Sequence, residues 1–194
     1  MPSDILSPTA QSTALNIFSN VLAQGISSYK RDAPLSLNCT PILNFALFTI
    51  LSTPPNILWQ RFLEDQFPTT IRAPHPNTEK PHAKEQPQNV TSIRNIAIKF
   101  LLDMTIGAAV NTVLFLGFMS YVNAPVNAGL DQGMWDVVAN DVRRKFWPLI
   151  VDGLKLWPAV SLMSFCVVPV DKRVLVGSLV GVGWNVYLSL LVGA

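Results

Sequence analysis

Charge is scarce in this sequence. Only 13% of its 194 residues are Asp, Glu, Lys or Arg, whereas 49% are hydrophobic. Typical soluble domains carry about 25% charged residues, so the composition favours a small membrane protein that crosses the bilayer several times. The net charge is only +2, and no basic stripe with interleaved aromatic residues is present. The sequence therefore predicts the lipid bilayer as partner and argues against a nucleic acid.

Cysteine and the familiar catalytic motifs are equally scarce. Cys39 and Cys166 are isolated thiols without CxxC spacing, so neither a disulfide framework nor a zinc site is indicated, and we expect both to be buried and inert. The sequence contains no nucleophile elbow, phosphate-binding loop, HExxH motif or dinucleotide fingerprint. We therefore expect no catalytic residue, no bound metal, no cofactor and no enzymatic activity.

Acidic residues are nearly absent from the apolar stretches, where Asp103 is the sole candidate. An ionisable residue inside a membrane is a functional hypothesis by default. A membrane-embedded enzyme usually needs paired acids, however, and here there is one. Lys99 lies four residues earlier, on the same face of a helix. We therefore expect an ion pair between Lys99 and Asp103 at the membrane edge, while a functional acid remains the alternative.

Apolar stretches predict the fold class. The last of them holds 21 residues without a charge and would form a helix about 31 Å long, close to the thickness of the hydrocarbon core. The sequence predicts an all-α, polytopic transmembrane helix bundle with four spans. A fifth, N-terminal helix rich in Ser, Asn and Gln either spans the membrane or lies amphipathically in its interface. The five stretches are Ala14–Tyr29, Pro41–Gln60, Ile96–Val122, Leu156–Val170 and Val174–Ala194.

Prolines and charges mark the expected boundaries. Pro54 and Pro55 predict a kink or break inside the second stretch. Pro169 should end a helix and open a tight turn that runs to Arg173 at one membrane face. Residues 64–95 combine five prolines with polar and charged residues, which indicates a solvated, disordered loop. The whole chain, 1–194, is then a single membrane-embedded domain around that loop.

Small and polar residues inside the stretches indicate how the helices meet. Gly177 and Gly181 form a GxxxG pattern, which predicts a helix-packing face within the bundle or between the copies of a homo-oligomer. Amide side chains recur on one face of the first helix and appear again in the third stretch. They either line a pore for small solutes or only join helices, and both readings stay open. The predicted pore-lining residues are Asn16, Asn20, Gln24 and Asn111.

The C-terminal third carries a dense and ordered set of residues that resembles the signature of the peroxisomal membrane protein 2/4 (Mpv-type) family. The resemblance extends more faintly through Ala14–Tyr29, Pro54–Phe67 and Lys99–Asp103. The signature residues are Trp157, Pro158, Phe165, Val168, Pro169, Arg173, Trp184, Asn185, Tyr187, Leu188 and Ser189.

The resemblance implies an integral membrane protein of the peroxisomal or mitochondrial inner membrane. Its implied function is a channel-like pore for small metabolites or a role in membrane homeostasis. The alternative is a non-conducting accessory protein that supports a partner enzyme or pathway. Physically, Trp157 and Trp184 can anchor at the interface or pack the hairpin, and Arg173 can bond helix-end carbonyls or lipid headgroups.

Four positions depart from the family pattern. The sequence has Thr53 where the family has Gly, Gln60 where Tyr is usual, Met104 where Gln is usual, and Ser164 where the family has Asn. We expect these changes to leave the fold intact and to alter any pore chemistry.

Overall fold

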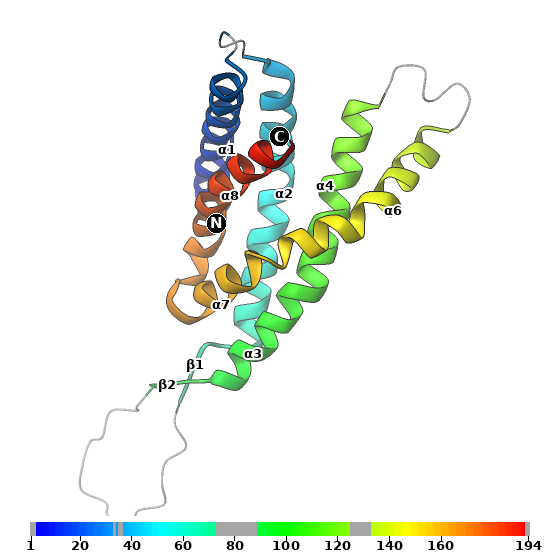
Figure 1. The fold of residues 1–194 in the computed structure, drawn as a ribbon. Helices are drawn as coiled ribbons and strands as arrows, with labels where there is room; N and C mark the ends of the chain where they lie inside the picture. Colours follow the sequence, from blue (N-terminus) through cyan, green and yellow to red (C-terminus); the bar gives the residue numbers. More distant parts are fainter. Residues whose placement is uncertain (1–2, 33, 35–36, 73–88, 125–132, 193–194) are drawn as a thin grey trace, which may run out of the picture.

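The computed structural model describes residues 3–32, 34, 37–72, 89–124 and 133–192, and they are overwhelmingly helical (Figure 1). The predicted all-α, polytopic fold is thus confirmed. The side chains of Asn185 and of residues 187–192 lie outside the described part. The helices are α1 (Ser3–Lys30), α2 (Cys39–Gln66), α3 (Ile93–Leu102), the π-helix η1 (Asp103–Gly107), α4 (Ala108–Asn123), α6 (Met134–Gly153), α7 (Trp157–Val167) and α8 (Val170–Val192).

The helices run alternately up and down (Figure 1). α1, α2 and α8 pack side by side, and α3, η1 and α4 form one long helix against which α6 lies. α7 lies between the end of α6 and the start of α8 and packs against α3. Elements far apart in the sequence, such as α1 and α8, therefore come together around one interior.

Two helices of the described residues are long and apolar enough to cross a membrane, namely α2 and the continuous helix Ile93–Asn123. α6 and α7 together would be a third, broken span, bent by 58°. The polar α1 is not among them and instead packs along α8 and α2, as expected of a helix that lines a bundle. The predicted last span, Val174–Ala194, falls in α8 and ends beyond the described residues.

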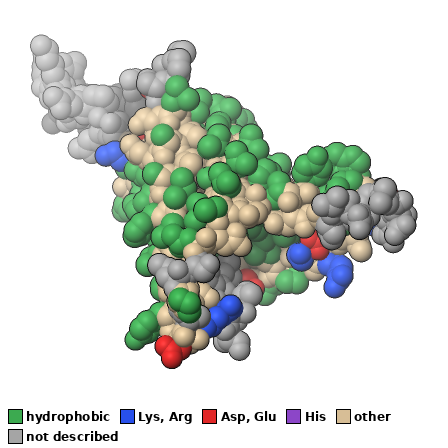
Figure 2. Space-filling model, turned by 90° about the horizontal axis from the view of Figure 1, so that it is seen from above, with side chains coloured by type: hydrophobic (Ala, Val, Ile, Leu, Met, Phe, Trp, Pro, Cys, Tyr) green, Lys and Arg blue, Asp and Glu red, His purple; other side chains and the backbone are tan. Residues whose placement is uncertain are grey.

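Small polar side chains lie inside the bundle, and large apolar ones lie on its outer surface. Fully buried side chains include Ser12 and Ser19, and Thr49 and Thr53 are also buried, whereas Leu51 of α2 is 62% exposed. Figure 2 shows hydrophobic side chains covering much of one face, with few charged ones. In water this would be unfavourable, but lipid tails are as apolar as leucine, so small polar residues belong between the helices of a membrane protein. The outer surface is therefore suited to lipid.

The ends of the predicted 64–95 loop are ordered, which corrects that boundary. Glu64 lies in the last turn of α2, and Ser92 caps α3 by accepting a hydrogen bond from Asn95 N at 3.3 Å. Between them, β1 (Thr70–Arg72) pairs antiparallel with β2 (Asn89–Thr91). The reason is that Glu64 is held by buried partners, so the flanking chain is fixed; residues 73–88 lie outside the described part.

The break before α8 is tighter than predicted. α7 ends at Val167, Val168 is extended (φ −100°, ψ 125°) and α8 begins at Val170. Asp171 to Arg173 thus form the first turn of α8, where the acidic residue suits the helix N-terminus. The prediction that both cysteines are buried is wrong, because Cys39 and Cys166 are exposed. In α7, Ser164 and Phe165 take the inward positions instead of Cys166.

α2 runs through Pro54 and Pro55 as one helix of 28 residues. Of the predicted kink or break at these prolines, the break does not occur, and the kink stays a prediction.

Candidate functional site

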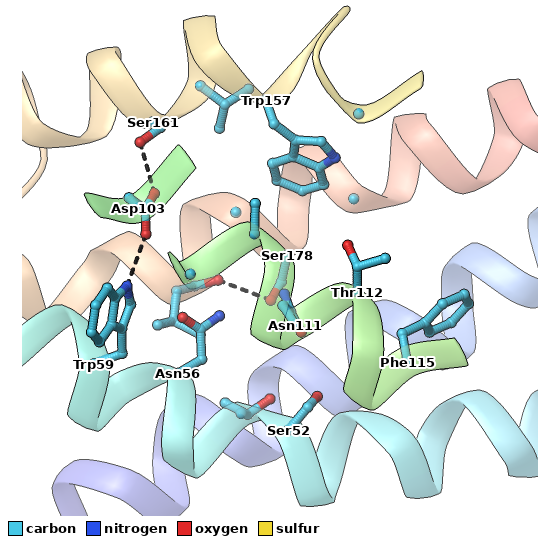
Figure 3. Close-up of a pocket in the computed structure, with 18 of the residues that line it drawn as sticks. Ser52, Asn56, Trp59, Asp103, Asn111, Thr112, Phe115, Trp157, Ser161 and Ser178 are labelled. Atoms are coloured by element: carbon cyan, nitrogen blue, oxygen red, sulfur yellow. Dashed lines mark hydrogen bonds between the residues drawn. The ribbon is translucent and has the colours of Figure 1, made fainter. Parts of the chain in front are cut away.

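A cavity of about 600 Å³ lies at the centre of the bundle, lined by residues of α1, α2, η1, α4, α6, α7 and α8. Hydroxyl and amide side chains line it among apolar ones (Figure 3), including Ser52, Asn56, Asn111, Thr112 and Ser178. Among the described residues that line it, Asp103 is the only acid and Arg173 the only base. The cavity thus offers hydrogen bonds from most of the helices and very little charge.

Asp103 is held entirely by neutral donors. Its Oδ1 accepts from Trp59 Nε1 at 3.1 Å and from Gln60 Nε2 at 3.0 Å, and its Oδ2 accepts from Ser161 Oγ at 2.7 Å (Figure 3). The predicted ion pair with Lys99 is therefore wrong. Lys99 turns instead to the end of α2, where its Nζ lies 2.7 Å from Glu64 Oε2.

The backbone around Asp103 is also unusual. η1 is a π-helix, a form that appears mostly as single turns inside α-helices and often at functional sites. At its end, a Cβ on Gly107 would come within 2.9 Å of Trp59 Nε1 and 3.1 Å of Asp103 Oδ1. Glycine at this position therefore lets the indole of Trp59 reach the carboxylate.

One helical turn away lies a set of charged residues that we call the charged layer: Glu64, Lys99 and Arg173. Glu64 Oε2 is 2.7 Å from Lys99 Nζ and 2.8 Å from Arg173 Nη2. Both cations also lie over the ring of the fully buried Phe165, at 5.3 and 4.9 Å from its centroid. The layer ties α2, α3, α7 and α8 together at the end of the bundle that carries the two strands.

The Asp103 layer, defined as Asp103 with Trp59, Gln60 and Ser161, stacks on the charged layer. Gln60 precedes Glu64 by one turn of α2, and Asp103 follows Lys99 by one turn of the next helix. The two layers are therefore separated by about 5.4 Å.

Each layer contains one buried polar atom without a hydrogen-bond partner among the described residues: Gln60 Oε1 and Arg173 Nη1. Gln60 is 9% exposed and Arg173 6%, and both side chains line the cavity. The orientation of the Gln60 amide is settled because its other end meets a carboxylate, which only accepts. A buried polar group left unpaired costs about 1–3 kcal/mol, so a ligand or water that reached these two atoms would gain hydrogen bonds.

The predicted pore-lining residues divide into two pairs. Asn16 and Asn111 do line the cavity. Asn20 instead donates to Asn16 Oδ1 at 3.0 Å, and Gln24 exchanges hydrogen bonds with the backbone of Asn38 at 2.8 and 3.0 Å. Gln24 thus joins α1 to the residue that caps α2, as the alternative held, whereas Asn20 bonds only within its own helix.

The glycines of α8 do not form a packing face within the chain. A Cβ at Gly177 or Gly181 would meet no atom within 4 Å, and both glycines line the cavity. Contact with α1 is made by hydroxyls instead: Ser178 Oγ donates to Ser12 Oγ at 2.8 Å, and Ser19 Oγ donates to Val182 O at 3.3 Å. Packing between copies of the chain stays a prediction.

The signature residues lie along α7 and α8 and at the break between them. Arg173 Nε donates to Ser164 O at 3.3 Å and to Val168 O at 3.1 Å, so this arginine bonds helix-end carbonyls. Pro158 lies in the first turn of α7, while Trp157 and Trp184 line the cavity. The side chains of Asn185, Tyr187, Leu188 and Ser189 lie outside the described residues.

The departures from the family pattern meet at one place. The four residues Thr53, Gln60, Met104 and Ser164 come from α2, η1 and α7, and all of them line the cavity. Glu64 and Trp59, in contrast, were not singled out from the sequence. Only their spacing along α2 with Gln60, on one face of a helix, could have indicated them.

Residues 129–189 match the model of the Mpv17 / PMP22 family. The chain is 37% identical to "Protein sym-1" of Neurospora crassa over 36% of the chain and 44% of that protein. It is 23% identical to "PXMP2/4 family protein 3" of Dictyostelium discoideum over 93% of the chain and 79% of that protein. It is 33% identical to "Mpv17-like protein" of Bos taurus over 49% of the chain and 43% of that protein. The chain thus spans less than half of two of these relatives, and no solved structure matches it.

Proposed function

We propose that the chain is a member of the Mpv17 / PMP22 family, whose model matches its residues 129–189, and that it is an integral membrane protein of the peroxisome or the mitochondrial inner membrane. Within this family, the role that we propose for it is to pass small solutes through its central cavity. The proposed role is transport without chemical change of the solute. The observation that carries it is the cavity of about 600 Å³, lined by hydroxyl and amide groups inside a bundle whose outer surface is apolar.

The polarity of the lining supports passage of solutes. An all-apolar lumen of this kind would dewet and close, whereas hydroxyls and amides retain water. Ser12 and Asn16 of α1 and Asn111 of α4 contribute polar groups from opposite parts of the bundle. The lining carries one acid and one base among its described residues, a balance that favours weak selectivity over capture of one strongly charged ion.

The test is to fill the cavity without disturbing the fold. Gly181→Leu places a large side chain at a position that lines the cavity and where a Cβ meets no atom within 4 Å. Gly25→Leu is the matched control, because a Cβ there is equally unhindered and Gly25 is not among the lining residues. Solute release from liposomes containing the purified protein is followed for ribitol and for succinate.

The wild type and Gly25→Leu should release solute at similar rates, and Gly181→Leu should do so several-fold more slowly. Equal rates for both variants would place the path elsewhere. If the inserted and folded wild type releases neither solute at varied membrane potential and pH, the transport proposal fails and the non-conducting accessory role replaces it.

A further inference from the structure

The two unpaired atoms of the stacked layers differ in hydrogen-bonding character. Gln60 Oε1 can only accept a hydrogen bond, and Arg173 Nη1 can only donate one. Both residues line the cavity, and both are more than nine-tenths buried. A ligand that satisfies both must therefore carry donors and acceptors together, as hydroxyl groups do.

The separation of the two layers sets how many such groups are needed. Gln60 belongs to the Asp103 layer and Arg173 to the charged layer, and the layers lie about 5.4 Å apart. One hydroxyl that bonds both atoms over about 2.7–3.0 Å each spans this separation only with a wide, nearly straight angle at its oxygen, so two neighbouring hydroxyls fit it with better geometry. A short carbon chain with a hydroxyl on each carbon spans this separation.

Charge selects against ions at this end of the cavity. Glu64 and Asp103 are balanced by Lys99 and Arg173, so the two layers together carry two acids and two bases. An anion would gain from Arg173 Nη1 but would lie beside the Asp103 carboxylate, and a cation would face the reverse conflict. A neutral polar solute meets neither repulsion.

Residues that differ from the pattern of the family also lie at this end of the cavity. Gln60 provides the unpaired acceptor, and Ser164 lies on α7 beside Arg173, whose Nε bonds its carbonyl. Two of the four residues in which this chain differs from the family pattern therefore surround the unpaired atoms, and all four line the cavity.

We propose that the end of the cavity between Gln60 and Arg173 binds small neutral polyols, whose hydroxyls donate to Gln60 Oε1 and accept from Arg173 Nη1. This names the solute class and rests on the proposed passage of solutes through the same cavity. The binding step requires no reaction and no cofactor.

The experiment measures binding separately from flux. Saturation-transfer NMR on the purified full chain in detergent reports contact with erythritol, and with succinate as an anion of the same carbon number. Erythritol should receive saturation from the protein and succinate much less. Gln60→Met, which keeps the length of the side chain but removes the acceptor, should weaken erythritol binding about tenfold. Gln66→Met, at an exposed position of the same helix, should leave it unchanged.

Unchanged erythritol binding in folded Gln60→Met would overturn the proposal. So would stronger transfer to succinate than to erythritol, or no transfer to erythritol at all, which would leave water as the occupant. If Gln60→Met does not fold, Gln60→Asn withdraws the same oxygen by one methylene and should give the same loss. Erythritol binding without solute release would contradict transport alone, and release without binding would contradict the polyol site alone.

Discussion

Two layers one helical turn apart stabilise a carboxylate inside the bundle in different ways. In the charged layer, Glu64 shares one oxygen between Lys99 and Arg173, so opposite charges cancel. In the Asp103 layer, a single carboxylate is stabilised by an indole, an amide and a hydroxyl, none of them charged. The charged layer ties four helices together, whereas the Asp103 layer keeps an acid at the cavity wall. The difference teaches that the first joins helices by paired charges, whereas the second places one acid, paired only with neutral donors, at the wall of the cavity.

Removing the acid of the charged layer should lower the stability of the protein more than any other change proposed here. Glu64→Gln leaves Lys99 (side chain 0% exposed) and Arg173 (4% exposed) as neighbouring buried cations. Breaking a buried ion pair in this way costs about 3–5 kcal/mol of stability. Thermal unfolding in detergent should show a large loss for Glu64→Gln and almost none for Asp65→Asn, an exposed acid one residue away.

A double variant sharpens that result. Adding Lys99→Met to Glu64→Gln removes one of the two unpaired cations, so the double variant should be more stable than Glu64→Gln alone. A double variant that is less stable would show that the charges of the layer do not govern its contribution.

Filling the space beside Trp59 should lower the stability of the protein by an intermediate amount. Gly107→Ala introduces a Cβ only 2.9 Å from Trp59 Nε1 and 3.1 Å from Asp103 Oδ1. Such overpacking costs about 1–3 kcal/mol, and it should displace the indole from the carboxylate. Gly117→Ala is the control, because a Cβ there meets no atom within 4 Å. Unfolding temperature and tryptophan emission should change in the first variant only; identical behaviour of the two would contradict the close approach.

Neutralising Asp103 should lower the stability of the protein least. In Asp103→Asn, the remaining oxygen can accept from Trp59 and Gln60, while the new amide can donate to Ser161 Oγ, which also accepts. The loss in the free energy of unfolding should be about 1 kcal/mol. Asp103→Leu leaves all three donors unpaired and should be clearly less stable than Asp103→Asn. Equal losses in the two variants would indicate that charge, not hydrogen bonding, holds this layer.

Local sequence features predicted the helices well and the contacts between them poorly. The third apolar stretch, Ile96–Val122, nearly matches the continuous helix Ile93–Asn123, and Pro169 marks the break before α8 because proline cannot continue a helix. The bond of Arg173 to helix-end carbonyls was also foreseen, since its partners lie close in sequence.

The ion-pair partner of Lys99 could not be predicted from local sequence features. Its true partner, Glu64, is 35 residues away along the chain, whereas Asp103 is only four away. Which acid it meets depends on where the end of α2 lies against α3, and this cannot be read from the spacing along one helix. The same reasoning applies to Gly177 and Gly181: a GxxxG pattern indicates that close approach is permitted, and in this fold the space beside both glycines belongs to the cavity.

The measurement that tests the account most directly is thiol accessibility on the two sides of α8. With Cys39 and Cys166 replaced by serine, a cysteine is introduced at Gly177, which lines the cavity, or at Leu179, which is 53% exposed on the outer surface. A small, water-soluble thiol reagent is then applied to the protein in liposomes. A water-filled cavity surrounded by lipid predicts fast modification of the cysteine at 177 and slow modification of that at 179. Fast modification at 179 with protection at 177 would contradict the central claim.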